Sequence, residues 1–307
     1  MPTYDGILNV YKEKGYTSHD VVAKLRGVLH QKKIGHTGTL DPDAQGVLPV
    51  CLGKATRLCD MLTDRQKTYR AVLILGRETD TQDLSGKVLS EHPVNVSEEE
   101  TRQVILDFLG TYEQLPPMYS ALKVNGKKLY ELARQGKVVE RQTRTVTIHD
   151  IVIESIDLPH VAMTVACSKG TYIRTLCHDI GQRLGCGGCM ESLLRTQVGR
   201  FRLEDSLTLS QIETLKEEGG LGEKIVSIEE MFEACIPLGT LPSSDRLVTN
   251  GNPLTEKDVF GEDWKKGLDA RREIYFRVYD SRGEFMGIYE WEQDKARLKP
   301  WKMFLGG

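Results

Sequence analysis

The residue best suited to chemistry is Asp41, which lies in a segment rich in glycine and proline that runs from Gly35 to Val50. Pro42 restricts the residue before it to extended backbone conformations, and Gly38 and Gly46 permit tight turns and close approach of the backbone. We therefore expect the Asp41 carboxylate to be held in place, available as a nucleophile or a general base. An ordinary turn, in which Asp41 caps a helix or closes a loop, fits the same residues.

A second carboxylate, Asp43, lies two residues further on and opens other possibilities. A calcium-binding loop would need a bidentate acid at its twelfth position, which is Leu52. A P-loop ending at Gly53 and Lys54 would need a glycine where the chain has Leu48. Both are set aside, whereas a hydrolase that uses paired carboxylates remains an alternative.

The elements around this segment predict a mixed architecture. Amphipathic helices are expected after Thr17-Ser18, after Ser97, from near Thr171, and after a capping box of Ser210 with Glu213. Strands are expected over residues 47–52, 68–75, 145–156 and 161–167, and a helix over 54–65. Without a regular alternation of strand and helix, this order favours an α+β fold with a largely antiparallel sheet.

Length and composition indicate two domains. The chain has 307 residues, 39% of them hydrophobic, and no long apolar run, so we expect neither export nor membrane insertion, and a cytoplasmic protein. The odd number of cysteines, seven, fits reduced thiols. Cys186 and Cys189 form one Cys-x-x-Cys without a second ligand pair, so no metal site is expected.

Charge is unevenly distributed, although the net charge is only −3. Between Met118 and Thr147, seven basic residues face two acidic ones, and periodicity fades, as expected of an excursion from the core. Between Glu204 and Glu233, nine acidic residues face two lysines. The basic stretch could hold RNA while the acidic one faces away, although two solvated faces would look the same.

Several motifs occur in an order that resembles one known family. After the Asp41 segment come Lys67-Thr68-Tyr69-Arg70-Ala71, Thr79-Asp80-Thr81-Gln82-Asp83, Pro116-Pro117-Met118-Tyr119-Ser120-Ala121-Leu122-Lys123, Ser168-Lys169-Gly170-Thr171-Tyr172-Ile173-Arg174 and Leu194-Arg195-Thr196. Together they span roughly residues 5 to 205 and resemble the TruB family of pseudouridine synthases. The resemblance implies the pseudouridine synthase fold over residues 1–236, with the basic insertion at about 118–147, and a β-rich RNA-binding domain of the PUA type over 237–307.

The resemblance also implies an activity and assigns roles. The bacterial members convert the T-loop uridine of tRNA (position 55) to pseudouridine, without metal or organic cofactor and without an obligatory protein partner. Asp41 is then the nucleophile, Arg174 its bidentate partner, and Tyr69 the residue that stacks on the target base. His36 enters the RNA loop and helps to hold the target nucleotide flipped out.

Other matched positions imply weaker assignments. Asp83 and Leu194 are expected to line the pocket, and Lys12, Tyr119 and Lys123 to contact RNA or the pocket. Without the resemblance, Arg174 would be a solvated arginine, Tyr69 a half-buried strand tyrosine and His36 a loop histidine. The main alternative function is a tRNA-binding or RNA-folding protein with little or no isomerase activity. Relatives that work with guide RNA and partner proteins share several of these motifs.

Overall fold

Alternating buried and exposed residues build one large mixed sheet, as β4 illustrates, where Lys67, Tyr69, Ala71, Leu73 and Leu75 are all buried. The computed structural model describes residues 3–124, 126–261, 264, 268 and 274–305. The main path of the sheet is β14 (Ile225–Val226), β1 (Gly6–Lys12), β3 (Gln45–Leu52), β12 (Gly188–Val198), β4 (Lys67–Leu75), β11 (His160–Cys167), β10 (Arg144–Asp157) and β7 (Gly110–Gln114). Off this path, β2 (Ile34–His36) pairs with β3, and β13 (Phe201–Arg202) with β12.

The pairing is antiparallel except where β12 runs parallel to β3. At this exception Leu194 pairs with Gln45 and Arg195 with Gly46, so β12 adjoins the start of the strand that follows Asp41. Gly46 is required here, because a Cβ atom would lie 2.2 Å from the carbonyl oxygen of Arg195. The predicted α+β class with a largely antiparallel sheet is confirmed.

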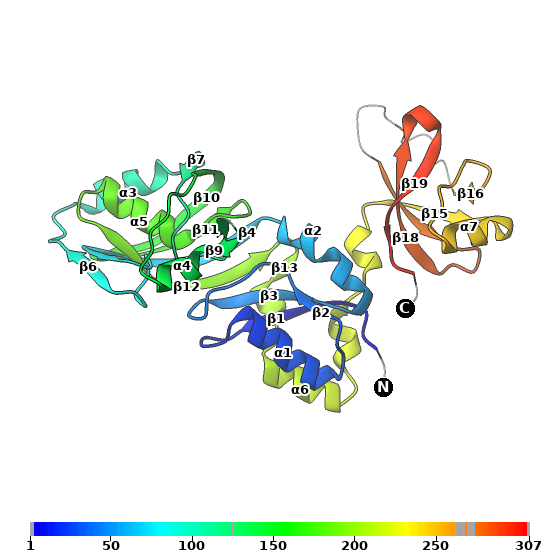
Figure 1. Ribbon diagram of the computed structural model, residues 1–307, viewed down its shortest axis with the longest axis horizontal. Helices are drawn as coiled ribbons and strands as arrows, with labels where there is room; N and C mark the ends of the chain where they lie inside the picture. The colour runs from blue at the N-terminus through cyan, green and yellow to red at the C-terminus, as the bar shows by residue number, and fades with distance from the viewer. Residues whose placement is uncertain (1–2, 125, 262–263, 265–267, 269–273, 306–307) are drawn as a thin grey trace.

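Helices cover the two halves of the sheet separately (Figure 1). The helices α1 (Ser18–Leu29) and α6 (Leu209–Glu217) pack on β1 and β3 through a cluster that includes Val21, Leu25 and Ile212. The helices α3 (Glu98–Leu106) and α5 (Ile173–Arg183) pack on the half that contains β4 and β11, in a second cluster. The predicted helix over 54–65 is a 3-10 segment (Gly53–Leu58) followed by α2 (Cys59–Thr63).

Capping residues set where these helices begin. Thr17 forms a reciprocal capping box with Asp20, and Ser97 accepts a hydrogen bond from the backbone of Glu100. The predicted box of Ser210 with Glu213 is wrong, because the cap of α6 is Thr208, which pairs with Gln211.

Two small hairpins stand beside the sheet. The first joins β5 (Arg77–Thr79) to β6 (Val88–Glu91). The second, β8 (Lys123–Val124) and β9 (Lys127–Lys128), belongs to the excursion between β7 and β10 and is followed by α4 (Leu129–Arg134). This excursion has its own small core of Met118, Leu129 and Leu132. Its basic side chains are therefore carried on a folded unit rather than on an unstructured loop.

The C-terminal residues form a second, β-rich lobe (Figure 1). Its sheet has the order β16 (Val259–Phe260), β15 (Ile236–Thr240), β17 (Tyr275–Tyr279), β18 (Phe285–Glu292) and β19 (Arg297–Met303), with α7 (Asp245–Thr249) beside it. Ile288 and Phe304 share an apolar cluster with Leu58 and Phe232 of the larger lobe. Among the described residues, no helix is long and apolar enough to cross a membrane.

Candidate active site

The Asp41 loop connects β2 to β3 and is fastened at several points. The hydroxyl of Ser18, at the start of α1, accepts a hydrogen bond from the Leu40 backbone nitrogen at 2.9 Å. Leu40 itself is buried. On the other side of Asp41, the Pro42 carbonyl accepts hydrogen bonds from the backbone nitrogen of Gly15 and from the Lys12 ammonium. The expectation that Asp41 is held in place is confirmed.

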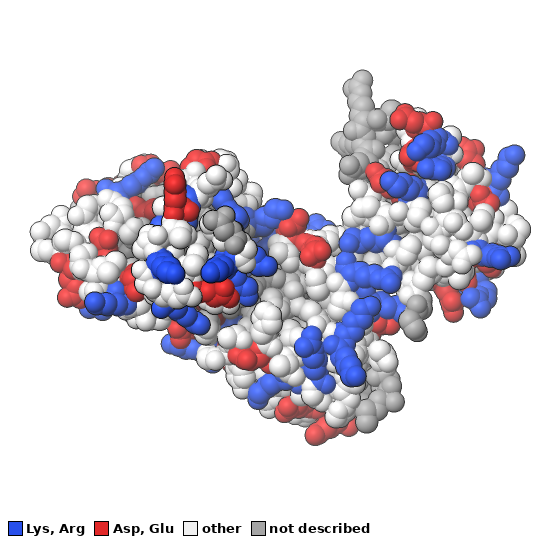
Figure 2. Space-filling model, in the orientation of Figure 1, with Lys and Arg blue, Asp and Glu red and all other residues white. Residues whose placement is uncertain are grey.

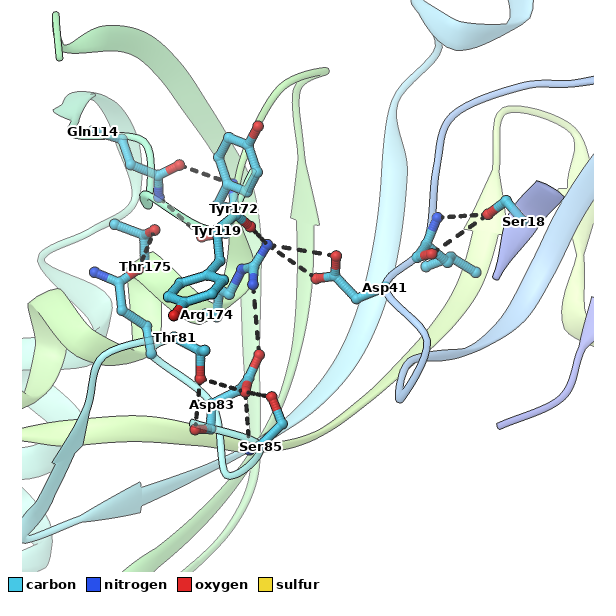
Figure 3. Close-up of polar contacts among 12 residues, drawn as sticks. Ser18, Asp41, Thr81, Asp83, Ser85, Gln114, Tyr119, Tyr172, Arg174 and Thr175 are labelled. Atoms are coloured by element: carbon cyan, nitrogen blue, oxygen red, sulfur yellow. Dashed lines mark hydrogen bonds and ion pairs between the residues drawn. The ribbon is translucent and has the colours of Figure 1, made fainter. Parts of the chain in front are cut away.

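Arg174 approaches Asp41 from the first turn of α5 (Figure 3). Its Nη2 atom lies 3.2 Å from Oδ2 and 3.5 Å from Oδ1 of Asp41, and also donates to the Tyr119 carbonyl at 2.7 Å. Its Nη1 atom faces Asp83 instead, 3.5 Å from Oδ2. The expected bidentate pair is therefore wrong in its geometry: the guanidinium is divided between two carboxylates.

Asp83 is held more tightly than Asp41 (Figure 3). Its Oδ1 atom accepts hydrogen bonds from the Thr81 hydroxyl at 2.7 Å and from the backbone nitrogen and hydroxyl of Ser85 at 3.0 and 2.5 Å. These three donors occupy Oδ1 and leave Oδ2 to face Arg174. The second carboxylate at Arg174 is thus rigidly placed.

The charges around Asp41 oppose one another. Burial raises the pKa of the Asp41 carboxyl above its usual range, Arg174 counteracts this rise, and the negative charge of Asp83 reinforces it. Arg174 is only 6% exposed, so its charge acts in a poorly solvated place. The arginine is the main group that favours the ionised form of Asp41.

Tyr69 lies on β4 directly opposite Arg195 of β12. Arg195 is 1% exposed, and its side chain donates from Nε to the Val47 carbonyl at 2.7 Å and from Nη2 to the Gly38 carbonyl at 3.2 Å. Burial raises the pKa of Tyr69, while Arg195 opposes the rise. Arg195 thus connects Tyr69 to both ends of the Asp41 loop.

Sequence reasoning missed Arg195 as a site residue, although it stands in the motif Leu194-Arg195-Thr196. The available signal was its position, because an arginine that points inward from a central strand must have partners.

A cleft brings most of the predicted residues together. Its lining includes Asp41, Tyr69, Asp83, Tyr119, Arg174 and Leu194. Basic side chains at the same cleft come from the strands, the excursion and the loop before α5: Arg70, Lys128, Arg134, Arg144 and Lys169. The cleft therefore joins a carboxylate–arginine centre to a basic rim.

Three predicted residues lie elsewhere. His36 is half-buried behind His19, whose ring meets it edge-on at 5.3 Å between centroids, and burial lowers the pKa of His36 to about 4. Lys123 is exposed on β8 in the excursion. Lys12 is fully buried, and its ammonium donates to the carbonyls of Glu13, Tyr16 and Pro42. The assignment of Lys12 as an RNA or pocket contact is wrong, because its side chain is buried and its ammonium binds the Pro42 carbonyl of the Asp41 loop.

The described residues contain no group of three or more histidines, cysteines or acids arranged to hold a metal ion. Cys186 and Cys189 are both buried free thiols.

Comparison with known proteins identifies the family. Residues 26–173 match the model for the TruB family pseudouridylate synthase N-terminal domain, and residues 174–233 match that for the tRNA pseudouridylate synthase B C-terminal domain. The chain belongs to the TruB family. It is accordingly a pseudouridine synthase, an isomerase, as the sequence motifs predicted.

Individual relatives agree with this assignment. The tRNA pseudouridine synthase B of Lachnoclostridium phytofermentans is 53% identical over 98% of this chain and 100% of its own. A Cbf5-Nop10-Gar1 complex contains a chain that is 28% identical, with a TM-score of 0.71, covering 98% of this chain and 85% of that one. An H/ACA RNP bound to a substrate RNA contains one that is 26% identical, with a TM-score of 0.70 and the same coverage. The TruB fold thus extends over nearly the whole chain.

Proposed function

We propose that this chain converts the T-loop uridine of tRNA (position 55) to pseudouridine, with Asp41 as nucleophile and the target base flipped out of its stack. The observation that carries the proposal is the division of the Arg174 guanidinium between Asp41 and Asp83 at the cleft. Relatives named tRNA pseudouridine synthase B support tRNA as the substrate.

The reaction breaks the bond between N1 of uracil and C1′ of the ribose, turns the base, and joins C5 to C1′. The C5 proton leaves and N1 gains one, so no atom is gained or lost overall. Asp41 supplies the carboxylate that attacks an electron-poor carbon of the nucleotide, and Arg174 keeps that carboxylate ionised and aimed. Tyr69 offers its ring to the uracil and its hydroxyl as a candidate for the proton transfer.

The position of Asp41 supports the proposal of a flipped base. Asp41 lies in a cleft beside the buried guanidinium of Arg174, and enzymes that do chemistry on a base take it out of its stack to reach such a site, which supports a flipped nucleotide here. His36 packs edge-on against His19, which lines the cleft, and we assign His36 to hold the RNA loop that the nucleotide leaves.

The basic rim accounts for RNA binding despite the net negative charge. Lys128 and Arg134 of the excursion, together with Arg144 and Lys169, would contact phosphates beside the cleft, and Lys123 would extend this contact. Figure 2 shows further lysines and arginines where the two lobes meet, a place that includes Arg57 and Lys302. We assign residues 237–307 as a PUA-like domain that contacts the same tRNA.

Tritium release tests this proposal. The purified protein alone is given tRNA transcribed with 5-tritiated uridine, and a second transcript carries cytidine at the T-loop target. We expect release from the first transcript only, with pseudouridine found on nucleoside chromatography. Binding without release supports the RNA-binding alternative or a need for partners, and release of free uracil supports a nucleoside hydrolase.

A further inference from the structure

Gln82 has an unusual backbone conformation. Its φ angle is 65°, in the left-handed region that glutamine rarely adopts. The described residues include two other non-glycine residues with positive φ, His30 and Ala296, and each caps the end of a helical segment. Gln82 terminates no helix, because it lies between the strands β5 and β6. It closes a turn instead, in which its backbone nitrogen donates to the Thr79 carbonyl at 3.2 Å.

The Gln82 side chain reaches the helix that carries Arg174. Its Oε1 atom accepts a hydrogen bond of 2.7 Å from the hydroxyl of Thr175, which is 1% exposed. Gln82 directly precedes Asp83, and Thr175 directly follows Arg174. This hydrogen bond, which we name the latch, thus runs beside the ion pair between Arg174 and Asp83.

The backbone around Gln82 is anchored to the sheet. The Gln82 carbonyl accepts from the Met190 nitrogen at 2.9 Å, and the Leu84 nitrogen donates to the Met190 carbonyl at 3.1 Å. Asp83 is therefore fixed to β12 on one side and, through the latch, to α5 on the other. The contact of 3.5 Å between Arg174 and Asp83 is too long to set this geometry by itself.

We propose that Gln82 is a positioning residue. Through the latch to Thr175 it fixes Asp83 relative to Arg174, so that Arg174 Nη2 keeps its contact with the Asp41 carboxylate. This inference rests on the proposed function, because it concerns the rate of that reaction. It gives the glutamine a role at this place, because its side chain reaches Thr175.

Four variants test the latch. Gln82→Gly removes the acceptor and suits the positive φ angle, and Thr175→Val removes the donor. The other two are the double variant and Thr175→Ser, which keeps a hydroxyl donor. Single-turnover tritium release is measured at several enzyme concentrations, to separate the maximal rate from the half-saturating concentration. We expect each of the first two to lower the maximal rate about tenfold, the equivalent of one hydrogen bond, with RNA saturation unchanged. The double variant should be no slower than either, and Thr175→Ser should restore the rate.

A matched control is Thr240→Val in the C-terminal lobe. Thr240 is fully buried and donates to Asp245 at 2.9 Å, so its loss should lower the thermal midpoint without changing the maximal rate. A Gln82→Gly variant with a normal maximal rate, additive losses in the double variant, or a Thr175→Ser variant as slow as Thr175→Val would overturn the latch. If the wild type itself releases no tritium, the proposed function fails and the latch with it. If the wild type releases tritium and the variants do so at the same rate, only the latch fails.

Discussion

The Nη2 atom of Arg174 lies 3.2 Å from Oδ2 of Asp41, where the loop between two strands meets the first turn of a helix. A cation in the first turn is disfavoured by the helix dipole, and this one is also buried. Two carboxylates and the Tyr119 carbonyl offset both costs. The arrangement is stable only while each partner remains in place.

Arg174→Lys should fold but lose activity. A single ammonium cannot face Asp41 and Asp83 together, so we expect the single-turnover rate to fall on the order of a hundredfold. Arg202→Lys is the matched control, because the Arg202 side chain is 63% exposed and pairs only with Glu204 among the ion pairs of the described residues. Near-normal turnover by Arg174→Lys would count against the divided guanidinium.

The acid limb of the pH–rate profile should move in opposite directions in two variants. If Asp41 is the nucleophile, as we propose, activity needs its ionised form, so the rate falls as the pH drops through its pKa, which lies above the usual value. Arg174→Gln removes a charge that lowers this pKa, so its limb should shift to higher pH. Asp83→Asn removes a charge that raises it, so its limb should shift to lower pH. Single-turnover rates with excess enzyme measure both, and shifts in the same direction would contradict the account.

Tyr69→Phe should affect chemistry more than binding. Under the proposed function, the ring that stacks on uracil remains, but the hydroxyl that is a candidate for the proton transfer is lost. We expect a maximal rate lower by about 10- to 100-fold at similar RNA affinity. Urea unfolding should change little, because the hydrogen bonds of the neighbouring Arg195 go to the Val47 and Gly38 carbonyls, which the variant keeps. A variant weakened only in RNA binding would assign Tyr69 to recognition alone.

Lys12→Met tests the support beneath the Asp41 loop. Removing the ammonium leaves the carbonyls of Glu13, Tyr16 and Pro42 without this donor, and we expect a loss of about 2 kcal/mol in urea unfolding. Lys14→Met is the matched control, since Lys14 is exposed. Equal stability of the two variants would show that the buried ammonium contributes little.

Much of the framework was predictable from local patterns. The capping box at Thr17, the alternation along β4 and the glycine-rich Asp41 loop each specify their structure through near neighbours. Predicting the geometry of the site would have required contacts between residues that are distant in the sequence. Nothing local indicates that Asp83 competes with Asp41 for Arg174, because the two carboxylates come from the β5–β6 and β2–β3 connections and the arginine from α5.

Other errors had equally specific causes. The assignment of Lys12 as an RNA or pocket contact rests on its matched position alone, and its hydrogen bonds to carbonyls beside the Asp41 loop are not visible in the sequence. At α6 two capping patterns overlap in the sequence, one beginning at Thr208 and one at Ser210. The helix begins after Thr208, which brings Leu209 into the helix and buries it.

The most direct test compares Asp41→Asn with Asp43→Asn in single-turnover tritium release from T-loop uridine under saturating enzyme. The two side chains are two residues apart in one loop, but Arg174 contacts Asp41. We predict no detectable release by Asp41→Asn despite normal RNA binding, and release by Asp43→Asn within about threefold of wild type, as for a charge outside the reacting groups. Release by Asp41→Asn at a comparable rate would contradict the assignment of the nucleophile.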